Sequence, residues 1–288
     1  MDDIKLDKLR GVAVGAAVGD ALGMPLEFGS ARSLDNLERE MIDGGLPAGS
    51  FTDDTELALA LAESLLHASP LDPQDLAQRF VDWYHAEPAD IGIHTSHVLG
   101  LVSRGMPWNR ASRQVQAAHP ISASNGSVMR CWPVAIRYWN SPDLLRSESR
   151  LQSRVTHRHA DCVKACEFVN LLISELVRSE PAIPPGECLR RGIATTLACV
   201  KPGKVLFNAI RTAKEKPRED LPNSGFVRDT LQSTIWALLN TDSFEEALVH
   251  AVNLGGDADT TGAVTGAVAG ALYGLDAIPA RWKTTLRG

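Results

Sequence analysis

The stretch Gly255-Gly-Asp257-Ala-Asp259-Thr-Thr-Gly262 combines two carboxylates with two hydroxyls and is bounded by glycines. It leads into residues 262–274, an apolar run in which every fourth residue is glycine. Because residues i and i+4 share one face of an α-helix, these glycines predict a smooth stripe against which a second helix can pack closely. The acids fall at the start of this helix, where unpaired backbone N–H groups favour negative charge.

A matching run near the N-terminus supplies the second helix. Residues 8–23 also carry glycine at every fourth position, from Gly11 to Gly23. A membrane-embedded dimer built on this spacing is the alternative, but the segment is short and contains Asp20. Each glycine costs a helix about 1 kcal/mol, so close packing has to offset several of them. We therefore expect both glycine-rich helices to be central and to lie in close contact.

The two acids Asp257 and Asp259 suggest a cation site. Two carboxylates about 4 Å apart repel by roughly 4 kcal/mol at an effective dielectric constant near 20, and aspartate and threonine oxygens suit Mg²⁺, Mn²⁺ or Ca²⁺. An EF-hand loop that starts at Asp257 is excluded because its twelfth position is Val268 instead of glutamate. Simple capping of the helix remains the competing interpretation.

A second hydroxyl–carboxylate cluster, Thr52-Asp-Asp-Thr55, precedes a helix marked by leucines at positions 57, 61 and 65. Capping accounts for one or two of these acids. It accounts less well for a second such cluster so far from the first in the sequence. Together the two clusters could supply the ligands of a two-metal site.

Four further segments each leave two interpretations open. Glu27 follows the first glycine helix and is either an exposed loop residue or a general base that faces the metals. Asp90 is either a helix cap, the interpretation that the sequence alone favours, or a pocket acid. The Asn125-Gly126 turn, in which Asn-Gly adopts a positive φ readily, either binds a phosphate through its N–H groups or is an ordinary connection between helices. His157 either contacts a ligand or caps a helix.

A zinc site is a weaker possibility. Residues 157–166 contain His-x-His-x-x-Cys-x-x-x-Cys, but Cys162 and Cys166 fall one helical turn apart on an apolar face, which favours core cysteines. No His-Asp dipeptide occurs anywhere in the sequence, which argues against a metal phosphohydrolase of the adjacent His-Asp type.

Composition favours one all-α domain over residues 1–288. The chain is 44% hydrophobic but only 6% aromatic, and no segment shows clear strand alternation. A net charge of -6 argues against a nucleic-acid partner or an anionic membrane. Five cysteines without a CxxC pair, a charged N-terminus and the lack of about eighteen consecutive apolar residues predict a reduced, cytoplasmic protein without a membrane span. We expect a monomer, since a cleft within one bundle needs no partner.

Taken in order, these motifs resemble those of the ADP-ribosylglycohydrolases of the dinitrogenase-reductase-activating type. The resemblance spans nearly the whole chain, from residues 15–23 through residues 52–55, 124–130 and 156–157 to residues 255–262. It implies an orthogonal all-α bundle with a binuclear metal cleft that holds two divalent cations, Mg²⁺ or Mn²⁺. The implied metal ligands are Thr52, Asp53, Asp54, Asp257, Asp259 and Thr260.

By the same resemblance, Glu27 and Asp90 are the catalytic acids of the cleft, and ADP-ribose is held by Asn125, Gly126, Ser127 and His157. Phe226 departs from the family's common Gly-Tyr-Val pattern, which removes one hydroxyl from the expected pocket. The implied activity is metal-dependent hydrolysis of the N-glycosidic bond between ADP-ribose and an arginine of a modified protein. Cleavage of another ADP-ribosyl linkage (serine, a nucleic-acid base or ADP-ribose 1″-phosphate) and ADP-ribose binding without catalysis are the alternatives.

Overall fold

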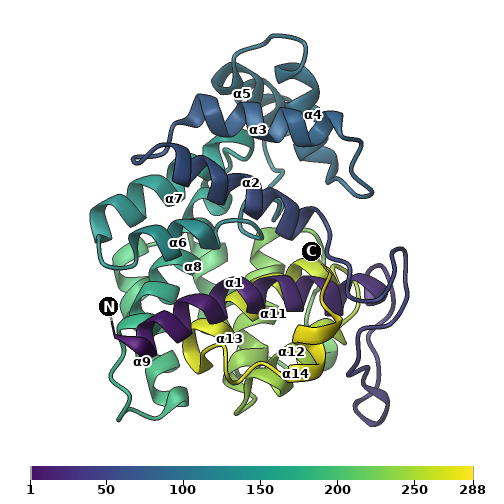
Figure 1. Cartoon of the computed structure of the whole chain (residues 1–288), viewed down its shortest axis with the longest axis vertical. Coiled ribbons are helices and arrows are strands. Elements are labelled where there is room, and N and C mark those ends of the chain that lie inside the picture. Colours follow the sequence, from purple (N-terminus) through teal and green to yellow (C-terminus); the bar gives the residue numbers. More distant parts are fainter. Residues whose placement is uncertain (1, 288) are drawn as a thin grey trace.

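An antiparallel pair of helices, α1 (Asp3–Gly23) and α13 (Ala258–Tyr273), forms the centre of the computed structural model, which describes residues 2–287. The two helices lie side by side, α1 in purple and α13 in yellow (Figure 1). Every residue of α13 from Ala258 to Leu272 is buried. The two glycine-rich segments are therefore central, as their spacing predicts.

Glycine permits this close approach. A Cβ added at Gly11 would stand 2.6 Å from the carbonyl oxygen of Gly270. An added Cβ at Gly15 would overlap the carbonyl oxygen of Gly266, and the reverse substitution meets the same obstacle. The backbones thus touch where side chains would normally separate two helices by 8–10 Å.

Fourteen α-helices and three short 3₁₀ helices span residues 2–287, and no strand occurs among them. The remaining α-helices are α2 (Asp53–His67), α3 (Pro73–His85), α4 (Ile93–Val102), α5 (Trp108–Ala118), α6 (Trp132–Tyr138), α7 (Pro142–Thr156), α8 (Ala160–Arg178), α9 (Pro185–Val200), α10 (Lys204–Arg211), α11 (Val227–Leu239), α12 (Phe244–Val252) and α14 (Ala280–Thr285). One hydrophobic cluster runs through most of them. The expectation of an all-α, single-domain fold is confirmed.

The helices group into a body and a smaller lobe. Helices α3, α4 and α5 lie together at one end of the molecule, while α1, α9, α12, α13 and α14 lie at the other (Figure 1). Most of α1 is buried: the stretch Asp3–Leu26 is long and apolar enough to cross a membrane, but 78% of its most apolar window is covered by the rest of the protein. Packing in the core therefore accounts for its apolar character.

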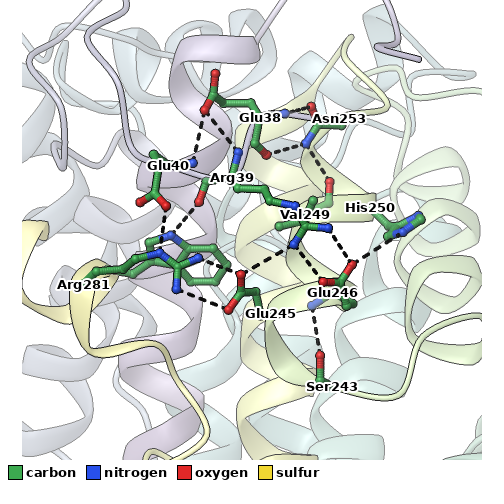
Figure 2. A network of polar contacts seen from close by, with 11 residues as sticks. Glu38, Arg39, Glu40, Ser243, Glu245, Glu246, Val249, His250, Asn253 and Arg281 are labelled. Atoms are coloured by element: carbon green, nitrogen blue, oxygen red, sulfur yellow. Dashed lines mark hydrogen bonds and ion pairs between the residues drawn. The ribbon is translucent and has the colours of Figure 1, made fainter. Parts of the chain in front are cut away.

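The segment 27–51, which joins α1 to α2, is fastened to the end of α12. Asn253 is buried there; its side chain accepts a hydrogen bond from the N–H of Glu38 and donates one to the carbonyl of Glu38, both at 2.8 Å. Beside this contact the exposed side chain of Arg39 pairs with Glu246 at 2.7 Å (Figure 2). These contacts fix a long connection whose first residue is Glu27.

Candidate active site and metal centre

A cleft of about 810 Å³ opens between the lobe and the body of the molecule. Its wall is formed by the start of α4, the turn at residues 122–126, the loop at residues 27–28, the segment 225–226 and the start of α13. Five carboxylates reach it, and they come from widely separated parts of the chain: Glu27, Asp53, Asp90, Asp257 and Asp259. The cleft is therefore acidic at one end.

Three of these acids converge. Glu27, Asp257 and Asp259 each place a carboxylate oxygen within 4.8 Å of the others. The turn that brings them together depends on Gly255 and Gly256, which have φ values of 66° and 61°, in the left-handed region. An added Cβ at Gly256 would also collide with the carbonyl of Asn223. The glycine pair thus places Asp257 immediately before α13, as the N-cap residue of that helix.

The cluster at residues 52–55 meets this triad. Thr260 at the start of α13 donates from its hydroxyl to Asp54 Oδ2 at 3.4 Å, and the hydroxyl oxygen of Thr52, whose proton is donated to Asp20, lies 3.2 Å from the same Asp54 oxygen. The predicted convergence of the two hydroxyl–carboxylate segments is therefore present in the fold. Asp53 and Thr260 line the cleft, whereas Thr52 and Asp54 lie buried directly behind its wall.

Asp20 organises the second cluster, a role that the sequence did not reveal. This aspartate of α1 is fully buried and accepts hydrogen bonds from the N–H and hydroxyl groups of both Thr52 and Thr55, at 2.6–3.1 Å. It thereby ties the N-terminus of α2 to α1. In the sequence, Asp20 is an acid within an otherwise apolar glycine stripe. This pattern argues against a membrane helix, but it does not identify the groups that Asp20 binds.

Burial and mutual repulsion disfavour ionisation of the cluster. Burial raises the pKa of Glu27 to about 7, and the nearby charges of Asp90 and Asp257 add to the rise. Burial, followed by the charges of Asp90 and Asp20, raises the pKa of Asp53 to about 8. The pKa values of Asp54 and Asp259 lie well above the usual aspartate range, again mainly through burial.

This donor set fits divalent cations. All its members are carboxylate or hydroxyl oxygens, which suit hard ions such as Mg²⁺ or Mn²⁺. Asp54 Oδ1 is buried and has no hydrogen-bond partner, a costly arrangement unless a ligand satisfies it. A bound cation would supply that partner and would also offset the repulsion among the carboxylates.

Asp90 is a cleft acid and not the helix cap that the sequence alone favoured. Helix α4 begins at Ile93, its N-cap is Gly92, and no side chain caps it. The Asp90 carboxylate instead accepts the N–H of Ile91 at 2.8 Å and lines the cleft. The alternative interpretation of this residue, a pocket acid, agrees with its position.

The turn around Asn125 borders the acidic end. The Asn125 amide donates to Asp257 Oδ2 at 2.7 Å and to the hydroxyl of Thr230 at 2.9 Å. Neither Asn125 nor Gly126 has a positive φ, so the expected left-handed Asn-Gly geometry is wrong. The Ser127 hydroxyl points into the core toward Ser153 and does not line the cleft, so any contact of Ser127 with ADP-ribose would have to use its backbone.

Ser124 lines the cleft, whereas Ser127, the expected contact of ADP-ribose, does not, and His157 lies beside Ser124. His157 is buried and contacts the hydroxyls of Ser124 through Nε2 at 3.0 Å and of Thr156 through Nδ1 at 2.7 Å. Burial lowers its pKa well below the usual range, so the ring is neutral. His157 lines the cleft but caps no helix start, since His159 is the N-cap of α8.

The expectation of core cysteines agrees with the structure. Cys162 and Cys166 are both buried, and Cys162 donates from Sγ to the carbonyl of Ser124. Among residues 2–287 the acidic triad is the one group of side chains with metal-ligand geometry, and it includes neither cysteine.

Apolar side chains at the mouth of the cleft were not foreseen. Four of them line the cleft while remaining largely exposed to solvent: Phe28 (86%), Ile93 (77%), Ile121 (86%) and Phe226 (43%). Single exposed apolar residues are ordinary, but a set gathered around one opening suggests contact with a ligand or partner. Phe226 thus occupies the expected position at the cleft, although without the tyrosine hydroxyl of the family pattern.

Comparisons with known proteins agree with these features. A family model described as ADP-ribosylglycohydrolase matches residues 1–288. ADP-ribosylarginine hydrolase Tri1 of Serratia proteamaculans is 35% identical over 293 residues, which cover 98% of this chain and 75% of that protein. ADP-ribosyl-[dinitrogen reductase] glycohydrolase of Rhodospirillum rubrum is 34% identical over 289 residues, which cover 97% and 90%. A solved structure described as an ADP-ribosylglycohydrolase-related protein complex superposes with a TM-score of 0.80 at 37% identity, covering 98% and 93%.

Proposed function

The chain belongs to the ADP-ribosylglycohydrolase family, and from this premise we propose that it hydrolyses the N-glycosidic bond between ADP-ribose and an arginine side chain of a modified protein. The observation that carries the proposal is the convergence of Glu27, Asp257 and Asp259 beside the unpartnered oxygen of Asp54. The arginine specificity is supported by the similarity to ADP-ribosylarginine hydrolase Tri1, which is 35% identical and matches 98% of this chain.

Two divalent cations would be held by the oxygens of Asp54, Asp257, Asp259 and their neighbours. Ions of this kind supply a water of lowered pKa and offset the charge of their ligands. The residues of the chain provide the rest: they bind and orient the substrate, accept a proton from the attacking water and return one to the departing guanidine.

Glu27 is the proposed proton acceptor. Its pKa is about 7 in the metal-free protein, and bound cations would lower it and keep the carboxylate in the ionised form that accepts a proton. The neighbouring carboxylate of Asp90 contributes negative charge on the same wall. That charge stabilises the positive charge that develops on the ribose as the glycosidic bond breaks.

The remaining lining of the cleft suits the adenosine diphosphate portion. It comprises the turn at Ser124–Gly126, which borders the acidic end, neutral His157 and exposed apolar side chains such as Ile121 and Phe226. Backbone N–H groups in the turn can donate hydrogen bonds to phosphate oxygens. The apolar side chains can cover the base.

The decisive experiment measures release of free ADP-ribose from ADP-ribosylated arginine, with Mg²⁺ or Mn²⁺ and with a chelator. We expect release that the chelator abolishes and that added metal restores. Release that persists in excess chelator would refute the mechanism. ADP-ribose binding without turnover of an arginine-linked or serine-linked substrate would refute the activity.

A further inference from the structure

The segment that builds the lobe has an unusual charge. Residues 91–142 contain no aspartate or glutamate, although the whole chain has 35 acidic against 29 basic residues. This segment forms α4, α5, the turn before α6 and α6 itself. Two of the three lobe helices, α4 and α5, therefore carry no negative formal charge, whereas α3 carries Asp75 and Asp82.

Five guanidinium groups gather on this lobe and on the adjoining end of α7. Arg104, Arg110, Arg113 and Arg154 are exposed, and Arg158 is partly buried. Within residues 2–287 none of the five takes part in an ion pair, whereas Arg39, Arg79, Arg146, Arg150 and Arg281 all do. We call these five residues the arginine surface.

Members of the arginine surface lie near one another. Arg158 donates from Nε to the hydroxyl of Ser112 at 2.7 Å, and its guanidinium lies 5.7 Å from the ring centroid of Trp108. Burial, followed by the charges of Arg113 and Arg154, lowers the pKa of Arg158. Like charges have thus been brought together with no acid from this chain to compensate them.

The arginine surface lies on the elements that also form one wall of the active-site cleft, mostly toward their far ends, while Arg158 directly follows the cleft residue His157. Helix α4 starts at the cleft wall with Ile93, and α5 ends there at Ala118. A shallower cavity of about 370 Å³ between α3, α4 and α5 includes Arg104 in its wall. It shares His97, Ala118 and His119 with the main cleft. A partner seated at the mouth of the cleft can therefore extend onto this basic lobe.

We propose that the arginine surface docks an acidic segment of the protein whose ADP-ribosylated arginine enters the cleft. The proposal rests on the proposed function and names the kind of substrate that it prefers. Guanidinium groups pair with carboxylates through two parallel hydrogen bonds. Complementary charge also accelerates encounter and selects among partners more than it adds affinity.

A protein partner fits the site better than a nucleic acid does. The scissile bond of the proposed reaction joins ADP-ribose to a protein side chain. The exposed rings and aliphatic side chains at the mouth, Phe28 and Ile93 among them, suit contact with a protein surface.

Three synthetic peptides of equal length provide the first test. Each carries one ADP-ribosylated arginine, flanked by glutamates, by serines or by lysines, and kcat/KM is measured on the intact, metal-loaded protein at low ionic strength. We expect the glutamate-flanked peptide to exceed the lysine-flanked one by about tenfold or more. Raising the salt concentration should shrink the difference, because surface charges are screened over about 10 Å at 0.1 M.

Charge reversal locates the effect. The double variant Arg110→Glu with Arg113→Glu should abolish the preference for glutamates and leave turnover of free ADP-ribosylarginine unchanged. The matched control reverses two exposed arginines elsewhere, Arg190 of α9 and Arg211 of α10, and should leave the preference intact. A thermal melt of each variant confirms that it is folded.

Each outcome decides the question. Equal kcat/KM for the three peptides, or a preference that survives the Arg110/Arg113 reversal, would overturn the proposal while leaving the proposed function standing. Stronger inhibition by a single-stranded oligonucleotide than by a polyglutamate of equal charge would favour a nucleic-acid partner and also overturn it. Absence of turnover on free ADP-ribosylarginine would instead refute the proposed function itself.

Discussion

Asp20 of α1 accepts hydrogen bonds from both the backbone N–H and the hydroxyl of Thr52, at 3.0 and 2.9 Å. These two residues are 32 positions apart in the sequence, and their contact fixes the start of α2 against the central helix pair. Asp53 and Asp54 follow at once, so the position of two proposed metal ligands depends on a residue that does not reach the cleft.

Replacing Asp20 by asparagine should therefore weaken metal binding. The amide keeps the shape of the side chain but presents a donor to groups that are themselves donors, namely the N–H and hydroxyl groups of Thr52 and Thr55. Outer-shell changes of this kind typically reduce metal affinity by about 10–100-fold, and we expect a loss in that range by calorimetric titration with Mn²⁺. As a control, Asp75→Asn removes an acceptor from Ser64 in α2, away from the cleft, and should leave the affinity unchanged.

The metal-free protein should lose stability as the pH rises from about 4 to about 8. Folding raises the pKa of Asp20 to about 6, of Glu27 to about 7 and of Asp53 to about 8. The folded state therefore binds more protons than the unfolded state in this range, so the free energy of unfolding falls with increasing pH. We expect a total decrease of more than about 1 kcal/mol, measured by urea denaturation in excess chelator.

Saturating Mn²⁺ or Mg²⁺ should reverse that trend. Metal ligands bind in their deprotonated form, so cation binding releases protons and strengthens as the pH rises. Stability in the presence of metal should be constant or increase over the same interval. A metal-free protein whose stability rises toward pH 8 would show that the cluster is not protonated in the way its burial requires.

The spacing of residues in the sequence was sufficient to predict the central helix pair. Glycine at every fourth position of a helix leaves a groove without Cβ atoms on one face. The backbone at Gly15 of α1 lies in the groove of α13, and the backbone at Gly266 of α13 lies in the groove of α1. The residues alone only suggested that residues 52–55 meet residues 257–260, since helix capping was an open alternative, and the resemblance to the ADP-ribosylglycohydrolases implied the shared site.

Side-chain direction in the turns could not be predicted in this way. Whether Ser124 or Ser127 faces the cleft depends on the backbone of the Asn-Gly turn, and that backbone does not adopt the left-handed conformation that its sequence favours. The roles of Asp20 and Asn253 depend on partners 32 and 215 residues away, respectively. A single sequence contains no record of such distant pairs.

The glycine stripe can be tested at its centre. Gly266→Ala improves helix propensity by about 1 kcal/mol, but the new Cβ would overlap the carbonyl oxygen of Gly15. Overpacking of this kind costs about 1–3 kcal/mol or more, so we expect a net loss of stability in urea denaturation. Gly45→Ala is the matched control, because no atom lies within 4 Å of the added Cβ. Equal stability of the two variants would contradict the close contact of α1 and α13.

The variant Asp54→Asn distinguishes the destabilisation that the acidic cluster causes in the metal-free protein from its contribution to metal binding and activity. The neighbouring charges of Asp20, Asp53 and Asp257 oppose ionisation of Asp54, so removing its charge should raise the melting temperature of the chelated protein. The same change should remove most of the stabilisation by Mn²⁺ and reduce activity by about a hundredfold or more, beyond what outer-shell changes usually cause. Thermal melts with and without metal provide the comparison. A variant that is stabilised by Mn²⁺ as strongly as the unchanged protein would remove Asp54 from the ligand set.

The contact between Asn253 and Glu38 should matter more than the ion pairs around it. Asn253 is 1% exposed, and its amide satisfies both backbone groups of Glu38 (Figure 2). Truncation to alanine leaves those groups without partners, which costs about 1–3 kcal/mol each when they are buried. Arg39 makes more pairs, but its side chain is 43% exposed, and exposed ion pairs contribute about 0–1 kcal/mol.

We therefore expect Asn253→Ala to lower the free energy of unfolding by at least about 2 kcal/mol and Arg39→Ala by less than about 1 kcal/mol. Because the segment that Asn253 fastens begins at Glu27, Asn253→Ala should also weaken Mn²⁺ binding in a calorimetric titration, whereas Arg39→Ala should not. High salt should diminish the effect of Arg39→Ala and leave that of Asn253→Ala unchanged, since screening acts on exposed charges and not on a buried amide. The opposite ranking of the two variants would mean that the charged surface contacts, and not the buried amide, hold this segment against α12.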